Sequence, residues 1–427
     1  MTQPPFRFIH ASDFHLERPP CGAGETPQPL RAAFVEAPYR AAQRVFDAAL
    51  AEQVDFVVLA GDLLQPEATG PRGPLFLVEQ FERLRAGGIQ AYWAGGHADP
   101  PEHWPAFARL PDNVHVFPER RAEQIVHHRE GQPLARLIGL SRRQAKKLRP
   151  GDFSSDADGL FSVAATYGAI DRGAIAKSGV RYWALGGRHA RETHAETPGM
   201  AHYPGTTQGR ELKEAGPHGC TLVDVNAEGK ARTRLLPTDA VRWRREEIAL
   251  DEATTKEGVE RLLAERLRAV AAAAPGVDQL VSWVISGPAP LVAPLRRGNF
   301  SAETLAWLRT EFGGASPIVW SLSLEAESPE TPSAWHQQDT ILGDFLRAVR
   351  DHQAQPDDEL NGLELETYLD ERRLAGALAG AVRLDEPATR QRVLRKAAML
   401  GGELLGGELS GGELSGGELS GVEEAGS

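Results

Sequence analysis

Hydrophobic and polar positions follow two different periods over the first 240 residues of the chain. Short runs rich in β-branched and aromatic residues predict strands, and the longer stretches between them repeat an apolar residue every three or four positions, as helices do. The predicted strands are residues 6–11, 54–60, 89–94, 135–140, 160–166 and 180–185, and the predicted helices are residues 38–53 and 75–86. This alternation of strands and helices predicts an α/β domain.

A second, smaller unit is predicted beyond residue 245, where the pattern changes. It indicates a strand, helix 256–273, strand 280–285, helix 301–312 and strand 318–324, which together form a compact α+β unit. The polar, proline-containing residues 328–333 are typical of a linker, and residues 340–400 are mostly helical in pattern, with breaks near Pro356 and Pro387. We therefore expect domains at 1–245, 246–333 and 334–400, followed by a tail at 401–427.

The tail repeats GGELS or a close variant with a period of five, and its glycine content predicts a disordered extension. It contains six Glu and no Lys or Arg, which accounts for half of the formal net charge of −12. The remaining body is only mildly acidic. Its overall field does not attract nucleic acid, but the body could still hold a local basic patch.

The cellular compartment is constrained by what the chain lacks. Cys21 and Cys220 are too few for a disulfide framework and are not spaced like a zinc ribbon. No apolar stretch approaches the roughly 18 residues that a membrane span needs, and the start of the chain has no signal-peptide pattern. We expect a soluble protein of the reducing cytoplasm, with no membrane partner.

Polar side chains follow four of the predicted strands at the point where each strand ends. Asp13 and His15 follow the first strand, Asp62 the second, His97 the third and His189 the last. In sheets built from βα units, ligands bind outside the carboxyl ends of the strands. One such cluster is often only a turn or a helix cap, but four in order predict a common site.

These segments carry a resemblance to a known family. The opening FIHASDFHLERP, the segment VVLAGDLL and the stretch YPGTTQGRELKEAGPHGCTLVDV at 203–225 resemble the motifs of calcineurin-like metallophosphoesterases, and among them the bacterial SbcD and YhaO group of DNA repair exonucleases. The resemblance covers residues 6–245. It implies a four-layer β-sandwich flanked by helices, followed by a small α+β capping domain and a helical C-terminal region.

The family's centre holds two divalent metals joined by a bridging carboxylate. Transferred residue by residue, the resemblance assigns the first metal to Asp13, His15, His189 and the bridging Asp62, all of which are present. His97 matches the family's catalytic histidine, which steadies the transition state or protonates the leaving oxygen.

The second metal's remaining ligands are missing. At the places where the family has Asn, His and His, this chain has Gly96, Tyr167 and Gly187. Glycine has no side-chain ligand and a neutral tyrosine is a poor ligand for a hard cation. The prediction is therefore a degenerate centre that binds one ion. Mn²⁺ is the expected ion, and Fe²⁺ and Zn²⁺ are the alternatives. The competing interpretation is a relic site that binds no metal.

Other residues near the motifs leave alternatives open. Arg188 could place a guanidinium near the vacant position and contact phosphate, or it could point to solvent. Asp99, His103, His194 and His202 could be replacement ligands or ordinary polar residues of surface loops.

Partners and activity follow from the resemblance. A basic cluster could contact a DNA backbone or be a solvated loop; it consists of Arg142, Arg143, Lys146, Lys147 and Arg149. The leading hypothesis is a weak phosphoesterase or nuclease. A non-catalytic DNA-binding or scaffolding subunit and a hydrolase of small phosphodiesters or nucleotides are the alternatives. Residues 340–400 are expected either to dock an SbcC-like coiled-coil ATPase or to pack on the chain's own capping domain.

Overall fold

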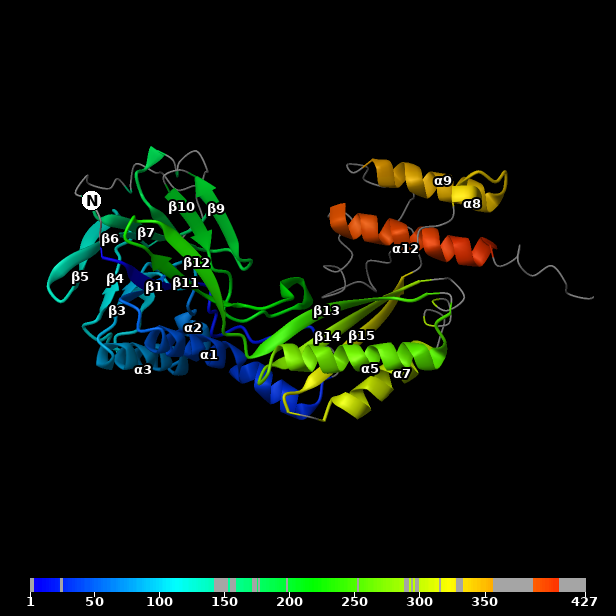
Figure 1. Ribbon diagram of the computed structural model, residues 1–427, viewed down its shortest axis with the longest axis horizontal. Helices are drawn as coiled ribbons and strands as arrows, with labels where there is room; N and C mark the ends of the chain where they lie inside the picture. The colour runs from blue at the N-terminus through cyan, green and yellow to red at the C-terminus, as the bar shows by residue number, and fades with distance from the viewer. Residues whose placement is uncertain are drawn as a thin grey trace, which may run out of the picture. The chain divides into compact units, whose positions relative to one another are not determined.

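The structure is a computed structural model (Figure 1) that describes residues 4–23, 26–141, 153, 159–170, 175, 177–196, 199–251, 253–287, 292, 295, 299–314, 316–327, 333–355 and 387–406. The chain divides into two compact units. The first contains residues 1–248, 254–285 and 294–325, and the second contains the segments between them and residues 326–427.

The first sheet of the first unit has six strands in the order β12-β11-β1-β2-β3-β4. Strands β1 (Phe6–Ala11), β2 (Phe56–Leu59), β3 (Gln90–Trp93) and β4 (Val114–Val116) are parallel. Strand β11 (Gly219–Val225) runs antiparallel to β1, and β12 (Ala231–Pro237) runs antiparallel to β11. Helices α1 (Gln28–Ala51) and α3 (Arg72–Ala86) cover one face, and the short α2 (Pro66–Thr69) precedes α3. The predicted strands of this sheet are confirmed.

The second sheet also has six strands, in the order β5-β6-β7-β8-β10-β9. Strands β6 (Gln132–Leu140), β7 (Phe161–Tyr167), β8 (Tyr182–Gly186) and β10 (Gly199–Tyr203) run parallel, and the edge strands β5 (Glu123–Arg129) and β9 (Glu192–Glu196) run antiparallel. Both sheets are therefore mixed.

The two sheets pack on one another through an aromatic core. Alternate residues of β1 point into it, so Phe8 is fully buried and stacks on Phe56 of β2, with ring centroids 4.9 Å apart, and meets Tyr182 of β8 edge-on at 5.3 Å. A separate cluster around Trp183 covers the outer face of the second sheet. The expected sandwich of two sheets is confirmed, with helices on the outer face of the first sheet.

A third sheet holds three strands, β13 (Val241–Ala249), β14 (Asp278–Ser286) and β15 (Val319–Glu327). The backbone N–H of Asp278 donates to Ala240, and that of Gln279 donates to Ile318, so the strands start side by side and run parallel. Helices α5 (Lys256–Ala273) and α7 (Asn299–Phe312) connect them and lie on one face (Figure 1). This is the predicted strand–helix order, with α5 at its predicted bounds.

Helix α1 begins at Gln28 rather than at the predicted Pro38, which lies inside the helix. Proline removes one helical hydrogen bond and therefore suggested a helix start. The additional turns are stabilised by tertiary packing, because Leu30 and Phe34 are buried in a cluster with Trp243 and Leu280 of the third sheet.

The described part of the second unit contains α8 (Ser333–His336), α9 (Ile341–Ala354) and α12 (Pro387–Gly406). Helices α9 and α12 pack through Val349 and Leu394. The tail was expected to be disordered from residue 401, but 401–406 are helical. Gly401 lies so close to Phe345 that an added β-carbon would be 2.0 Å from its ring, so here glycine permits close helix packing.

Several predicted features lie outside the described residues. These are the basic cluster at 142–149, the region 356–386 and the repeats from 407 onward. Within the described parts, none of the helices combines the length and apolar character that a membrane crossing requires.

Candidate metal centre

The loops that follow β1 and β2 are joined by backbone hydrogen bonds. The N–H of Asp13 donates to Gly61 at 2.9 Å, and the N–H of His15 donates to Asp62 at 3.1 Å. Asp13, His15 and Asp62 all have left-handed backbones, with φ of 54°, 46° and 54°. Such conformations are costly for residues other than glycine and are concentrated at functional sites.

Three of the predicted ligands come together at the carboxyl ends of the strands. One ligand atom from each of Asp13, His15 and His189 lies within 4.8 Å of the others. Asp13 and His15 are only 1% and 3% exposed, and the rings of His15 and His189 are 5.3 Å apart at a steep angle. The pattern of polar residues at the strand ends predicted that these side chains lie close together, and the structure brings these three together.

The free atoms of this group suit a cation. Asp13 Oδ2 accepts hydrogen bonds from Ser12 Oγ at 2.5 Å and from the N–H of Gly187 at 2.9 Å. By contrast, Asp13 Oδ1 and His15 Nε2 are buried, and no described residue hydrogen-bonds to either of them. Leaving buried polar atoms unpaired is costly, and one carboxylate with two imidazoles is a donor set that divalent transition metals accept. The residues present therefore fit such an ion.

Three buried carboxyl groups, those of Asp13, Asp62 and Asp99, are concentrated at this point of the fold. Burial is the main cause that raises the pKa of Asp13 well above its usual value; hydrogen bonds from Ser12 and Gly187 oppose the rise, and the charges of Asp62 and Asp99 add to it. Burial, followed by the charge of Asp62, raises the pKa of Asp99 to about 8. A bound cation would relieve this repulsion.

Asp62 is not part of the three-residue group. Its Oδ2 accepts a hydrogen bond from the Tyr167 hydroxyl at 2.9 Å, and its Oδ1 accepts one from the N–H of Ala98 at 2.8 Å. Both carboxylate oxygens are thus already engaged within the chain. The expected bridging role of Asp62 stays a prediction.

Gly96 and Gly187 make room for the ring of Tyr167. A β-carbon added at Gly96 would lie 2.9 Å from that ring and 2.5 Å from Asp62 Oδ1, and one added at Gly187 would lie 3.0 Å from the ring. Gly187 also has a φ of +94°, which side chains rarely tolerate. The three residues predicted to stand in place of a second metal's ligands are therefore packed together, with an aromatic ring filling the space between two glycines.

Two residues that the sequence analysis missed hold the His189 ring. Glu214 Oε1 lies 2.9 Å from His189 Nδ1, and Arg210 Nη2 lies 2.8 Å from the same nitrogen. Burial alone would raise the pKa of Glu214, but hydrogen bonds from His189 and Arg210 outweigh it and hold that pKa well below its usual range. Both residues lie within the segment 203–225 that resembles the family's motif. An arginine and a glutamate four positions apart can form an ion pair, and this spacing was the signal that the sequence offered.

Glu17 was also missed. Its Oε1 lies 3.7 Å from His15 Nδ1, and its Oε2 accepts a hydrogen bond from the N–H of Gln65 at 3.1 Å. The carboxylate thus sits beside the second histidine of the group, as ligand-orienting carboxylates do. It is only four residues from Asp13, but no motif distinguished it from a surface glutamate.

The considered replacement ligands are all engaged elsewhere. Asp99 accepts backbone hydrogen bonds from Asp62, Leu63 and Gly96 and so ties the second and third strand-end loops together. His202 lies between the hydroxyls of Thr193 and Thr221. Both are buried, so the interpretation of these two as surface loop residues is wrong.

The remaining candidates are more exposed. His194 pairs with Glu192 at 2.8 Å, and His103 lies 3.8 Å from Glu67. Arg188 also pairs with Glu192, at 2.5 Å, and its guanidinium lies 5.0 Å from the centre of the Tyr203 ring. His97 is exposed in the loop after β3.

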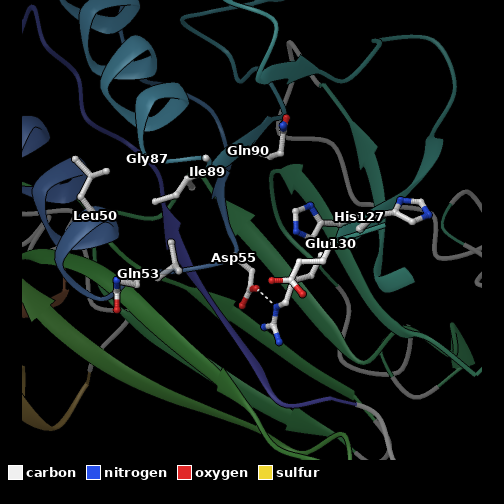
Figure 2. Close-up of a pocket in the computed structure, with 12 residues that line it drawn as sticks. Leu50, Gln53, Asp55, Gly87, Ile89, Gln90, His127 and Glu130 are labelled. Carbon is white, nitrogen blue, oxygen red and sulfur yellow. Dashed lines mark hydrogen bonds and ion pairs between the residues drawn. The ribbon is translucent and has the colours of Figure 1, made fainter. Parts of the chain in front are cut away.

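A hollow of about 490 Å³ lies elsewhere in the first unit (Figure 2). It is lined by residues that precede β2 and β3 and by the β5–β6 turn, including Asp55, whose Oδ1 is 2.6 Å from Arg129 Nε. The amino ends of parallel strands are not where ligands of such sheets bind. The hollow contains none of the predicted site residues.

Comparisons with known proteins agree with the motifs. Residues 6–149 match the family model of calcineurin-like phosphoesterases. The chain is 30% identical over 382 residues to YhaO of Bacillus subtilis (strain 168), an uncharacterized metallophosphoesterase, covering 84% of this chain and 90% of that protein. A solved dimetal phosphatase from Danio rerio is 10% identical, with a TM-score of 0.32 over 54% of this chain and 98% of its own. A likeness this low bears on neither site nor substrate.

Proposed function

Since the chain belongs to the calcineurin-like metallophosphoesterases, whose members bind divalent metals, we propose that it binds one divalent cation through Asp13, His15 and His189. We further propose that Mn²⁺ is the preferred ion and that phosphodiester hydrolysis is weak. A chain of this kind would bind fewer ions than a two-metal phosphatase and would hydrolyse its substrate more slowly.

The observation that carries this proposal is the hydrogen bond from Tyr167 to Asp62. A bridging carboxylate must offer oxygen to both ions, yet here one oxygen of Asp62 accepts from Tyr167 and the other from a backbone N–H. The Tyr167 ring lies against Gly96 and Gly187, where ligands of a second ion would have to project. A second ion would therefore have to share the Asp62 oxygens with these two donors, and its ligands at residues 96 and 187 would have to displace the Tyr167 ring.

The roles of the chain's own residues follow from this geometry. Asp13 Oδ1 and His15 Nε2 are the buried atoms free to hold the ion. When bound, a divalent cation supplies Lewis acidity and positive charge beside a phosphate. Asp99 keeps the loops around Asp62 and Gly96 in place. His97, exposed beside them, is proposed to donate a proton to the leaving oxygen.

The proposed substrate is a phosphodiester, and by relation to the SbcD and YhaO group it is DNA. The test is hydrolysis of bis(p-nitrophenyl) phosphate and of linear duplex DNA with Mn²⁺, comparing wild type with Asp13→Asn. We expect a slow rate that the substitution abolishes. A rate that Asp13→Asn leaves unchanged would show that another centre, or a contaminant, performs the hydrolysis.

The second candidate is a non-catalytic subunit that scaffolds an SbcC-like coiled-coil ATPase. It is favoured by large apolar side chains exposed on α9 and α12, where Ile341, Leu400 and Leu404 are 76%, 55% and 73% exposed. In this case no Asp13-dependent hydrolysis occurs. The full chain instead co-purifies with the ATPase, and Ile341→Ser with Leu404→Ser reduces recovery.

A further inference from the structure

The ring of His189 lies against two charged side chains that contribute no ligand atom to the three-residue group. Glu214 Oε1 is 2.9 Å from His189 Nδ1, and Arg210 Nη2 is 2.8 Å from the same nitrogen. The side chains of Glu214 and Arg210 are only 12% and 14% exposed, so water competes weakly for them. Their contacts with the ring are therefore part of the built site.

The two contacts require opposite forms of the imidazole. Glu214 can only accept, so its contact needs a proton on Nδ1 and leaves the lone pair on Nε2. Arg210 can only donate, so its contact needs the lone pair on Nδ1, which in a neutral ring puts the proton on Nε2. In the second form Nε2 carries a hydrogen and cannot bind a cation.

The surrounding contacts favour Glu214. Its carboxylate accepts hydrogen bonds from the backbone N–H of Arg210 at 2.8 Å and from Arg210 Nη2 at 3.1 Å. Both bonds fix the carboxylate beside Nδ1 without using the imidazole. Arg210 thus has an anionic acceptor within reach, and it can satisfy its own N–H group when Nδ1 is protonated.

We propose that Glu214 is the positioning residue of His189: it accepts the Nδ1 proton in a hydrogen bond and thereby turns an unprotonated Nε2 toward Asp13 and His15, while Arg210 holds Glu214. The inference builds on the proposed cation site, but it concerns the tautomer of the metal-free protein. Outer-sphere carboxylates of this kind orient histidine ligands and raise their basicity.

A specific role for Arg210 follows. Without Glu214, the guanidinium is the remaining polar neighbour of Nδ1 and donates to it, so the proton moves to Nε2. Glu214→Ala should therefore invert the tautomer as well as loosen the ring. Removing both residues should abolish that inversion and recover part of the affinity lost in Glu214→Ala.

The experiment measures ¹⁵N chemical shifts of the metal-free protein labelled with [¹⁵N]histidine, using His189→Gln to identify the His189 signals. Mn²⁺ affinity is measured in parallel by calorimetry. Wild type should have the proton on Nδ1, and Glu214→Gln, which keeps an acceptor oxygen, should retain it. Glu214→Ala should have it on Nε2 and bind Mn²⁺ about 10- to 100-fold more weakly, with the Arg210→Ala double variant between the two.

Glu192→Ala is the matched control, because Glu192 pairs with His194 at 2.8 Å within β9 and with Arg188, and neither of these belongs to the three-residue group. It should change neither the His189 tautomer nor the affinity. A proton on Nε2 in wild type, or an unchanged tautomer in folded Glu214→Ala, refutes the inference. A chain that has the expected tautomer but binds no Mn²⁺ instead refutes the proposed function and leaves the role of Glu214 standing.

Discussion

Replacing Tyr167 with phenylalanine tests the contact on which the single-cation proposal depends. The hydroxyl lies 2.9 Å from Asp62 Oδ2, and the two residues are 9% and 4% exposed. Tyr167→Phe keeps the ring between its two glycines and removes only the donor. Because hydrogen bonds to charged groups contribute about 1.5–3 kcal/mol, we expect the free energy of unfolding to fall by that amount.

The assay is urea unfolding at pH 7, followed by the fluorescence of the buried tryptophans. Tyr92→Phe is the matched control, since its hydroxyl lies 3.0 Å from a neutral partner, His127 Nδ1, on a different pair of strands. Such a bond contributes only about 0.5–1.5 kcal/mol. If Tyr167→Phe costs no more than Tyr92→Phe, the Asp62 carboxylate does not depend on Tyr167 and the proposal loses its main support.

Three further predictions concern buried positions in the two sandwich sheets and their loops. Burial, the largest cause, lowers the pKa of His202 in the folded protein to about 3, whereas its pKa in the unfolded chain is about 6.5. The neutral ring therefore contributes fully to the free energy of unfolding above pH 6.5. As the pH falls below that value the contribution is lost, and the loss is about 2 kcal/mol at pH 5. His202→Gln should therefore reduce the difference in unfolding free energy between pH 7 and pH 5, and an unchanged difference would contradict it. Gly96→Ala would place a β-carbon 2.5 Å from Asp62 Oδ1, so we expect the free energy of unfolding, measured in urea, to fall by about 1–3 kcal/mol. A variant as stable as wild type would show that the loop moves to accommodate the methyl group. For the same reason, restoring a second site with Gly96→Asn, Tyr167→His and Gly187→His should destabilise the chain more than Tyr167→His alone.

Local pattern was sufficient for half of the strands of the two sandwich sheets, namely β1, β2, β3, β6, β7 and β8, and for the three residues that come together at the site; it did not predict β4, β5, β9, β10, β11 or β12. Strand β1 has its predicted bounds because its alternate residues face two different cores. Asp13 and His15 follow β1 of the first sheet and His189 follows β8 of the second, and the packing of the two sheets brings the carboxyl ends of these strands together. These predictions needed only the order of elements and the residue that follows each strand.

Long-range contacts could not be predicted in this way. Helix α1 extends past Pro38 because its first turns pack on residues more than 200 positions away, around Trp243. The bond from Tyr167 to Asp62 joins residues 105 positions apart, and Glu214 reaches His189 across 25. Gly96, Tyr167 and Gly187 were named together from the sequence, but the packing of the tyrosine ring between the two glycines was not predicted.

The most direct test of the account is a count of metal ions per chain. Protein loaded with Mn²⁺ and freed of excess metal is analysed by native mass spectrometry, for wild type, Asp13→Asn and Asp62→Asn. The account predicts one ion per chain in wild type and none in Asp13→Asn. It predicts one in Asp62→Asn, because in wild type the Asp62 carboxylate is held by Tyr167 and Ala98 and lies outside the three-residue group. Two ions per wild-type chain, with one lost in Asp62→Asn, would contradict it, and so would a wild-type chain that retains none.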